Sequence, residues 1–201
     1  MKQLLLNIQP PAAPSFDNFI TGQNAEVLRS LHDVMQGRST TRFLYVWGEH
    51  GSGKTHLLLA AQAMGAHIAD DVQSLDDEAQ ITLFDAFNHI KAEGGVFITA
   101  GQHAPGQMGL RDDLATRLAW GLVYQLQPLS DDEKADALRA HARDRGMKLP
   151  DDVIAYCLRY LRRDLQTLMA VLDAVDKWSL TTKKPVTVPL LKKMLQLAPE
   201  M

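Results

Sequence analysis

The sequence predicts an α/β protein in which a short parallel sheet of about four strands is followed by a helical subdomain. Three observations support this fold class. Short apolar runs alternate with segments of helical periodicity up to Pro128, which is typical of a parallel sheet covered by helices. From Ser130 onward only helical patterns occur. A glycine-rich turn joins the first predicted strand to the helix that follows it.

The α/β part begins after a linker. Residues 10–14 contain three prolines, which cannot continue a helix or a central strand. We therefore expect a tail and linker over 1–11, the α/β domain over 12–128 and the helical lid over 129–201. Apolar periodicity predicts helices at 24–35, 54–64 and 77–90, and strands at 43–47, 66–69, 96–100 and 122–126.

Four helices are predicted in the lid. Ser130 and Glu133 have the capping-box spacing that begins a helix. Pro150 and Asp151 begin a second helix. Leucine and other apolar residues recur at helical spacing between 165 and 175, and a fourth helix is predicted over about 188–197.

Composition narrows the class of protein. A net charge of −3 disfavours a protein that works mainly by coating nucleic acid. Cys157 is the single cysteine, so no disulfide or thiolate metal site forms within one chain, which fits a reducing cytoplasm. The apolar run at residues 4–6 is too short for a signal peptide, and no segment approaches the roughly 20 apolar residues of a membrane span.

A phosphate-binding motif follows the first predicted strand. Residues 48–55 satisfy G-x-x-x-x-G-K-[ST], and the motif consists of Gly48, Glu49, His50, Gly51, Ser52, Gly53, Lys54 and Thr55. Backbone N–H groups of such a loop surround phosphate, the lysine reaches the β and γ oxygens, and the threonine hydroxyl binds Mg²⁺. The motif predicts bound ADP or ATP with Mg²⁺; the alternative is a chance glycine turn.

An acidic pair follows the second predicted strand. Asp70 has the position of a Walker B carboxylate that contacts the magnesium ion through water. Asp71 stands where a water-activating carboxylate would lie, and is therefore a candidate catalytic residue. The alternative is that both carboxylates simply begin a solvated loop.

Five stretches together resemble a known family. They occur in the family's order at 16–22, 47–58, 69–73, 113–121 and 161–165. They resemble the AAA+ portion of the bacterial replication initiator DnaA and, within that group, the Hda-like regulators of DnaA. The resemblance implies an AAA+ nucleotide-binding domain with a helical lid.

The resemblance assigns roles to two arginines. Arg117 lies in the stretch that would offer an arginine finger to a nucleotide on a neighbouring protomer; the alternative is a surface arginine paired with Asp112 or Asp113. Arg163 aligns with the sensor 2 arginine that would reach the protein's own nucleotide, with Arg162 as the second choice. Either lid arginine could instead be a solvated helix charge.

The resemblance also places residues around the base and at the N-terminus. Phe19 and Ile20 would border the adenine, with His56 adjoining the phosphate loop; alternatively, Phe19 pins the linker to the core.

The tail resembles a peptide that binds the DNA polymerase sliding clamp, and the residues that would bind are Gln3, Leu4, Leu6 and Ile8. The alternative is a leucine-rich disordered leader. The chain leaves no room for DnaA's C-terminal DNA-binding module, so sequence-specific DNA binding is not expected.

Two departures from the family affect the prediction. Almost no residues separate the helix after the phosphate loop from the strand before Asp70, so a strand and helix of the family are missing, and the sheet is expected to be short at one edge. Gly101 falls at the sensor 1 position, where relatives carry a polar side chain, so intrinsic ATP hydrolysis is expected to be weak or absent. Trp47, Trp120 and Trp178 are expected to pack in cores or at the domain seam.

These features lead to one main hypothesis and two alternatives. The main hypothesis is a clamp-tethered regulator that presents Arg117 to ATP-bound DnaA, stimulates its hydrolysis and lowers replication initiation. The first alternative is an AAA+ ATPase that assembles with itself, like a helicase loader. The second is a non-catalytic interaction module that keeps nucleotide as a folding ligand.

Overall fold

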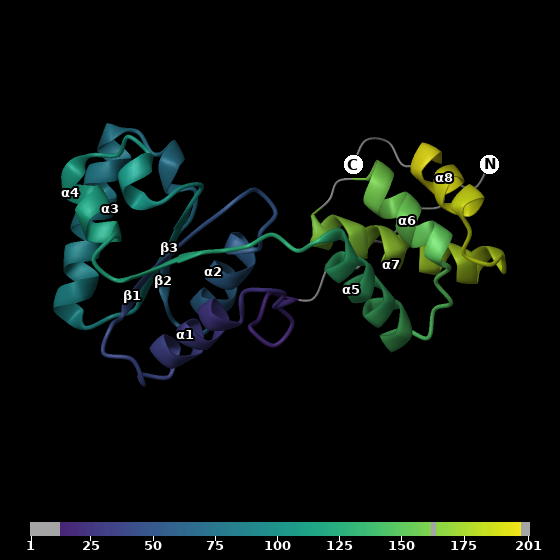
Figure 1. Ribbon diagram of the computed structural model, residues 1–201, viewed down its shortest axis with the longest axis horizontal. Coiled ribbons are helices and arrows are strands. Elements are labelled where there is room, and N and C mark those ends of the chain that lie inside the picture. The colour runs from purple at the N-terminus through teal and green to yellow at the C-terminus, as the bar shows by residue number, and fades with distance from the viewer. Residues whose placement is uncertain (1–12, 162–163, 198–201) are drawn as a thin grey trace. The chain divides into compact units, whose positions relative to one another are not determined.

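The computed structural model describes residues 13–161 and 164–197 (Figure 1). The chain divides into two compact units, one over Ala13–Pro128 and one that begins at Leu129. Within the described residues, no helix is long and apolar enough to cross a membrane. Each unit has its own buried apolar core.

The first unit contains a four-stranded parallel sheet in the order β2-β3-β1-β4. The strands are β1 (Phe43–Trp47), β2 (His67–Ala69), β3 (Phe97–Gly101) and β4 (Leu122–Gln125). This confirms the predicted short parallel sheet. β2 is only three residues long and forms one edge, which places the end of β3 between the ends of β1 and β2.

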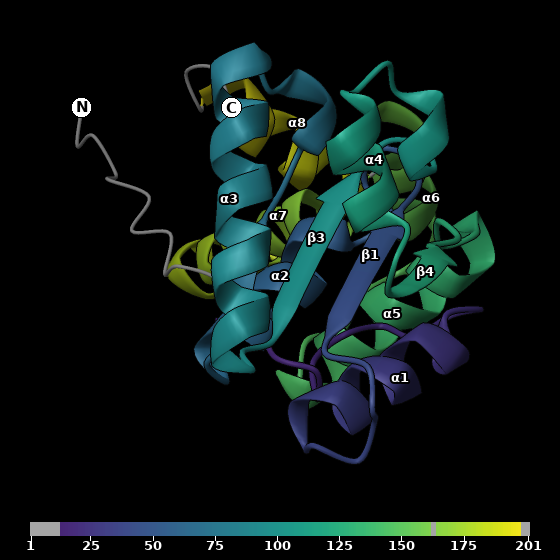
Figure 2. The ribbon, with the colours of Figure 1, turned by 90° about the vertical axis from the view of Figure 1, so that its left-hand side faces the viewer.

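Helices cover both faces of the sheet (Figure 2). On one face, α1 (Ala25–Met35) and α2 (Lys54–Ala63) pack on alternate residues of the strands, such as Leu44 and Ile98. On the other face, α3 (Asp77–Glu93) and α4 (Asp112–Leu118) pack on Phe43, Tyr45 and Phe97. The alternation follows from the two-residue period of a strand, which directs neighbouring side chains to opposite faces.

Local signals account for the ends of α3. Asp76 caps its first turn by accepting a hydrogen bond from the Ala79 N–H at 2.8 Å. The helix runs three residues beyond the predicted end at 90 and stops at Gly94, which takes the left-handed conformation that favours glycine. Sequence periodicity did not predict α4 or the short 3₁₀ turns η1 (Val72–Ser74) and η2 (Pro105–Gln107).

The second unit is helical, with α5 (Asp131–Asp144), α6 (Asp151–Tyr160), α7 (Leu165–Thr182) and α8 (Val188–Leu197). The capping box of Ser130 and Glu133 forms as predicted. Asp173 of α7 accepts hydrogen bonds from His141 Nε2 of α5 at 2.6 Å and from Nη2 of Arg145, the residue that follows α5, at 2.9 Å. This carboxylate joins α5 to α7 at the margin of the apolar core.

Candidate nucleotide site

The phosphate loop connects β1 to α2, and its glycines are required by space and by backbone conformation. A Cβ at Gly48 would collide with the carbonyl oxygen of Leu126. Gly53 has φ +99°, and a Cβ there would lie 2.7 Å from the Phe19 ring. The loop backbone can therefore curl at the N-terminus of α2, where helix N–H groups attract anions.

Lys54 is buried within this loop. Its side chain is 8% exposed, and Nζ donates to the carbonyl oxygens of Gly48 at 2.7 Å and Glu49 at 2.9 Å. Burial lowers the pKa of Lys54, and the nearby Asp70 and Asp71 carboxylates partly oppose this effect. A buried ammonium that contacts only neutral carbonyls in its loop is suited to an anionic ligand.

Ser52 gives a second indication that the loop fits a ligand. Its Oγ is buried and has no hydrogen-bond partner among the described residues. A buried hydroxyl left without a partner costs free energy, and such groups in native proteins call for an explanation such as a ligand or water. A phosphate oxygen in the loop would accept from this hydroxyl.

The acidic pair lies next to the phosphate loop. Thr55 Oγ1 donates to Asp70 Oδ2 at 2.6 Å, so the two groups expected to bind Mg²⁺ are in contact. Asp70 Oδ1 accepts from the Asp71 N–H at 2.9 Å. Asp71 itself has φ +48°, in the left-handed region that aspartate tolerates better than most residues. Asp71 is exposed at this turn.

Gln73 holds Asp71 in place, a role that the sequence did not reveal. Its side-chain amide donates to Asp71 Oδ1 at 3.0 Å, and its carbonyl oxygen accepts from the Gln102 N–H at 3.0 Å. The side chain therefore links the end of β2 to the end of β3. No sequence signal could have found it, because Gln102 is distant in the chain.

Gly101 is the last residue of β3 and stands at the predicted sensor 1 position. A Cβ there would clash with the Tyr45 hydroxyl and approach the sulfur of Met108 at 3.0 Å. Tyr45 is 1% exposed, and its hydroxyl donates to the His103 carbonyl oxygen at 2.7 Å. The space that a side chain would need is thus occupied by a residue from β1.

The predicted adenine-side residues lie near the loop. The Phe19 ring contacts Gly53 and lies 5.5 Å from the His56 ring, centroid to centroid. His56 Nε2 is 2.9 Å from the Ser15 carbonyl oxygen, which fastens the preceding segment to α2. Phe19 also packs on the apolar core, and Ile20 is half-buried. Glu49, His50 and Gly51 are exposed on the loop.

Arg117 lies on α4, and the ion pairs of the described residues do not join it to Asp112 or Asp113. Asp113 pairs with Arg111 at 3.0 Å. The Arg117 guanidinium carbon instead lies 5.5 Å from the Phe84 ring centroid and 5.9 Å from that of Phe87, both on α3.

Several other predicted residues lie outside the described ranges, namely Gln3, Leu4, Leu6, Ile8, Arg162 and Arg163.

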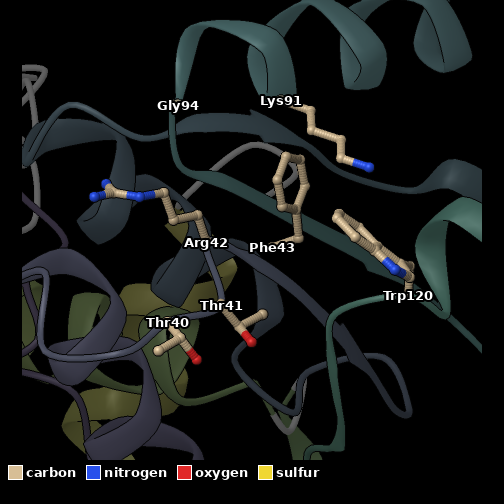
Figure 3. Close-up of a pocket in the computed structure, with 8 residues that line it drawn as sticks. Thr40, Thr41, Arg42, Phe43, Lys91, Gly94 and Trp120 are labelled. Carbon is tan, nitrogen blue, oxygen red and sulfur yellow. The ribbon is translucent and has the colours of Figure 1, made fainter.

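A surface pocket of about 340 Å³ lies at the end of the strands opposite to the phosphate loop (Figure 3). Thr41 and Phe43 line it at the start of β1, whereas the phosphate loop follows the end of β1. Trp120 is 54% exposed here, with Lys91 Nζ 3.7 Å from its ring centroid. Trp120 therefore does not pack inside a core, one of the two positions expected for it, because α4 ends at Leu118 and leaves its ring at the margin of the core.

The sheet order, the phosphate loop after β1, the acidic pair after β2 and the separate helical unit define a P-loop protein of the AAA+ class. Residues 131–195 match the family model of the Hda lid domain. Domain III of DnaA from Thermotoga maritima is similar over 96% of this chain and 99% of that chain, with a TM-score of 0.75 and 20% identity. The helical unit thus matches the Hda lid domain, and the fold of the chain is similar to that of DnaA domain III.

Two further structures show how widely this fold is shared. AMPPCP-bound DnaA from Aquifex aeolicus matches over 88% of this chain and 70% of that chain, with a TM-score of 0.66 and 20% identity. A variant of RuvB from Thermotoga maritima matches over 92% and 72%, with a TM-score of 0.65 and 15% identity. At these identities the likeness concerns the fold.

Proposed function

We propose that this protein is a nucleotide-binding regulator of replication initiation that stimulates ATP hydrolysis by DnaA through Arg117. The observation that carries the proposal is the Hda-type lid at 131–195 on a chain whose phosphate loop has a buried lysine without an anionic partner in its loop. A similar DnaA structure is titled as bound to AMPPCP, which supports a nucleotide as the ligand here.

The residues around the loop suit ADP or ATP with Mg²⁺. Lys54 would turn from the loop carbonyls to the phosphate oxygens, and the Ser52 hydroxyl would donate to one of them. Thr55 and Asp70 would supply oxygen ligands, directly or through water, to a magnesium ion, which neutralises phosphate charge when bound. Asp71 is the candidate to orient water.

Retention of nucleotide with slow turnover is the expected behaviour of this site. Asp71 is held by Gln73 rather than directed freely at the loop. Gly101 offers no side chain at the end of β3, where a polar group could help to orient water, and Tyr45 occupies the adjacent space. The protein therefore acts on its partner's hydrolysis rather than its own. Steady-state turnover by the isolated protein at the rate of a motor would instead favour a self-assembling ATPase.

Calorimetry tests the nucleotide part of the proposal. The full chain should bind ADP and ATP in the presence of Mg²⁺. Lys54→Ala should weaken binding at least tenfold, because it removes the charge at the centre of the loop. Lys91→Ala is the matched control, since that lysine lines the pocket at the end of the strands opposite to the phosphate loop. Absence of binding by the native protein would refute this part.

A reconstituted assay tests the regulatory part. ATP-loaded DnaA is mixed with the protein, the sliding clamp and DNA, and phosphate release is followed. Arg117→Ala should abolish the stimulated component, because arginine fingers contribute roughly 10³ to 10⁵ in rate. Arg38→Ala, which changes an exposed arginine paired with Asp33, should leave it intact. Equal rates with and without Arg117 would exclude the finger mechanism.

The tail is tested by clamp binding. We infer that Gln3, Leu4, Leu6 and Ile8 insert into a groove on the sliding clamp and tether the regulator there. Gln3→Ala should reduce capture of the full chain by immobilised clamp, and stimulation of DnaA should then require a higher protein concentration. Unchanged capture would show that the tail is not the tether.

A further inference from the structure

The Arg117 side chain rests on two aromatic rings that come from a different helix. Its guanidinium carbon lies 5.5 Å from the Phe84 centroid and 5.9 Å from the Phe87 centroid, within the range of a cation–π interaction. Phe84 and Phe87 are three residues apart on α3 and therefore share one face. The two rings form a ledge on α3, and α4, which carries Arg117, packs against α3.

The ledge is fixed because one of its rings belongs to the core. Phe87 is 2% exposed, and its ring lies 4.4 Å from that of Phe43, centroid to centroid. Phe84 is half-buried at the margin of the same apolar cluster. Phe87 is therefore part of the core, whereas Phe84 is the ring that can be changed without opening it.

No charged group competes for the arginine in the described part of the chain. The ion pairs found there do not include Arg117, and Asp113 is engaged by Arg111. Stacking uses the flat face of a guanidinium and leaves the N–H donors at its edges available to an anion. The contact with Phe84 can thus orient the group without consuming its hydrogen bonds.

We propose that Phe84 is a positioning residue for Arg117, and that its ring holds the guanidinium in place to engage the phosphates of a nucleotide on the partner. This inference rests on the proposed function, in which Arg117 acts in trans. An arginine side chain loses considerable rotamer freedom when it is fixed in one geometry. A finger that is already held in place loses less of that freedom at engagement, so the ledge raises the rate of the stimulated reaction.

The test compares Phe84→Leu, Phe84→Met and Phe84→Tyr in the full chain with ATP-loaded DnaA, clamp and DNA. Leucine and methionine remove the aromatic face, whereas tyrosine keeps it. Phe84→Leu should lower the maximal stimulated rate about threefold to tenfold, with the half-saturating concentration unchanged. Phe84→Tyr should stay within about twofold of the native rate. If the leucine variant does not fold, Phe84→Met replaces it in the same measurement.

Lys91→Met is the matched control, because Lys91 of α3 makes the same kind of contact with Trp120, which follows the end of α4. It should leave the stimulated rate unchanged. Native rates in Phe84→Leu and Phe84→Met, while Arg117→Ala abolishes stimulation, would overturn this inference and leave the proposed function standing. An equal fall in the tyrosine and leucine variants, or a rise in either, would also overturn it. If Arg117→Ala leaves the stimulated rate unchanged, both the proposed function and this inference are refuted.

Discussion

Replacement of Gly101 by alanine tests whether Tyr45 determines the residue at the end of β3. Gly101 is buried in a regular strand, so alanine meets no backbone strain there. Its Cβ would clash with the Tyr45 hydroxyl and lie 3.0 Å from the Met108 sulfur and 3.1 Å from Val72 Cγ2. The hydroxyl cannot turn aside freely, because it donates to the His103 carbonyl oxygen.

The magnitudes follow from this geometry. Gly101→Ala inserts a methyl group into a filled space and should lower the free energy of unfolding by about 1 to 3 kcal/mol. Tyr45→Phe removes one buried hydrogen bond and should cost about 0.5 to 1.5 kcal/mol. The double variant should cost only about 1 to 2 kcal/mol, because the new methyl group occupies the space that the hydroxyl leaves. The loss of unfolding free energy in the double variant should therefore be smaller than the sum of the two single losses.

Urea unfolding of the parent protein, the two single variants and the double variant measures this coupling. A Trp178→Phe background leaves Trp47 and Trp120 as reporters, and both lie in the same unit as Gly101. Distant sites add within about 0.5 kcal/mol, whereas contacting sites do not. Additive losses in the double variant, or a negligible loss in Gly101→Ala alone, would refute the argument that Tyr45 excludes a side chain here.

Three further predictions concern the helical unit. Ser130→Ala should cost about 1 kcal/mol, because the α5 capping box loses its hydroxyl; circular dichroism during thermal unfolding measures this. Asp173→Ala should cost about 1.5 to 3 kcal/mol in urea unfolding, since His141 and a neighbouring arginine lose their shared acceptor; no loss would mean that the pairing is not stabilising. Burial raises the pKa of Cys157 to about 11, so its thiol should resist a disulfide reagent at pH 8 until urea unfolds the protein. Because the folded state holds this proton more tightly, stability should fall as pH rises from about 9 to about 11.

The sequence predicted most elements because their signals are local. Apolar periodicity located every strand to within one residue at each end, and the predicted cap at Ser130 involves hydrogen bonds over three residues. α4 was missed because it is seven residues long and buries only Leu114 and Leu118, too few positions to establish a period. The exposure of Trp120 was not predicted because it depends on where α4 ends against α3.

The phosphate loop was predictable because glycine spacing, a preceding strand and a following helix are all written within about a dozen consecutive positions. The order of the strands decided the rest of the site. It brings Gln102 to Gln73, the Tyr45 hydroxyl to Gly101 and the Arg117 guanidinium to Phe84, and each of these contacts joins residues more than 25 positions apart. By itself the sequence determined where the P-loop motif lies and which segments form helices and strands. Only the tertiary structure decided which side chains hold the acidic pair and the arginine, because those neighbours are set by packing across the sheet rather than by spacing along the chain.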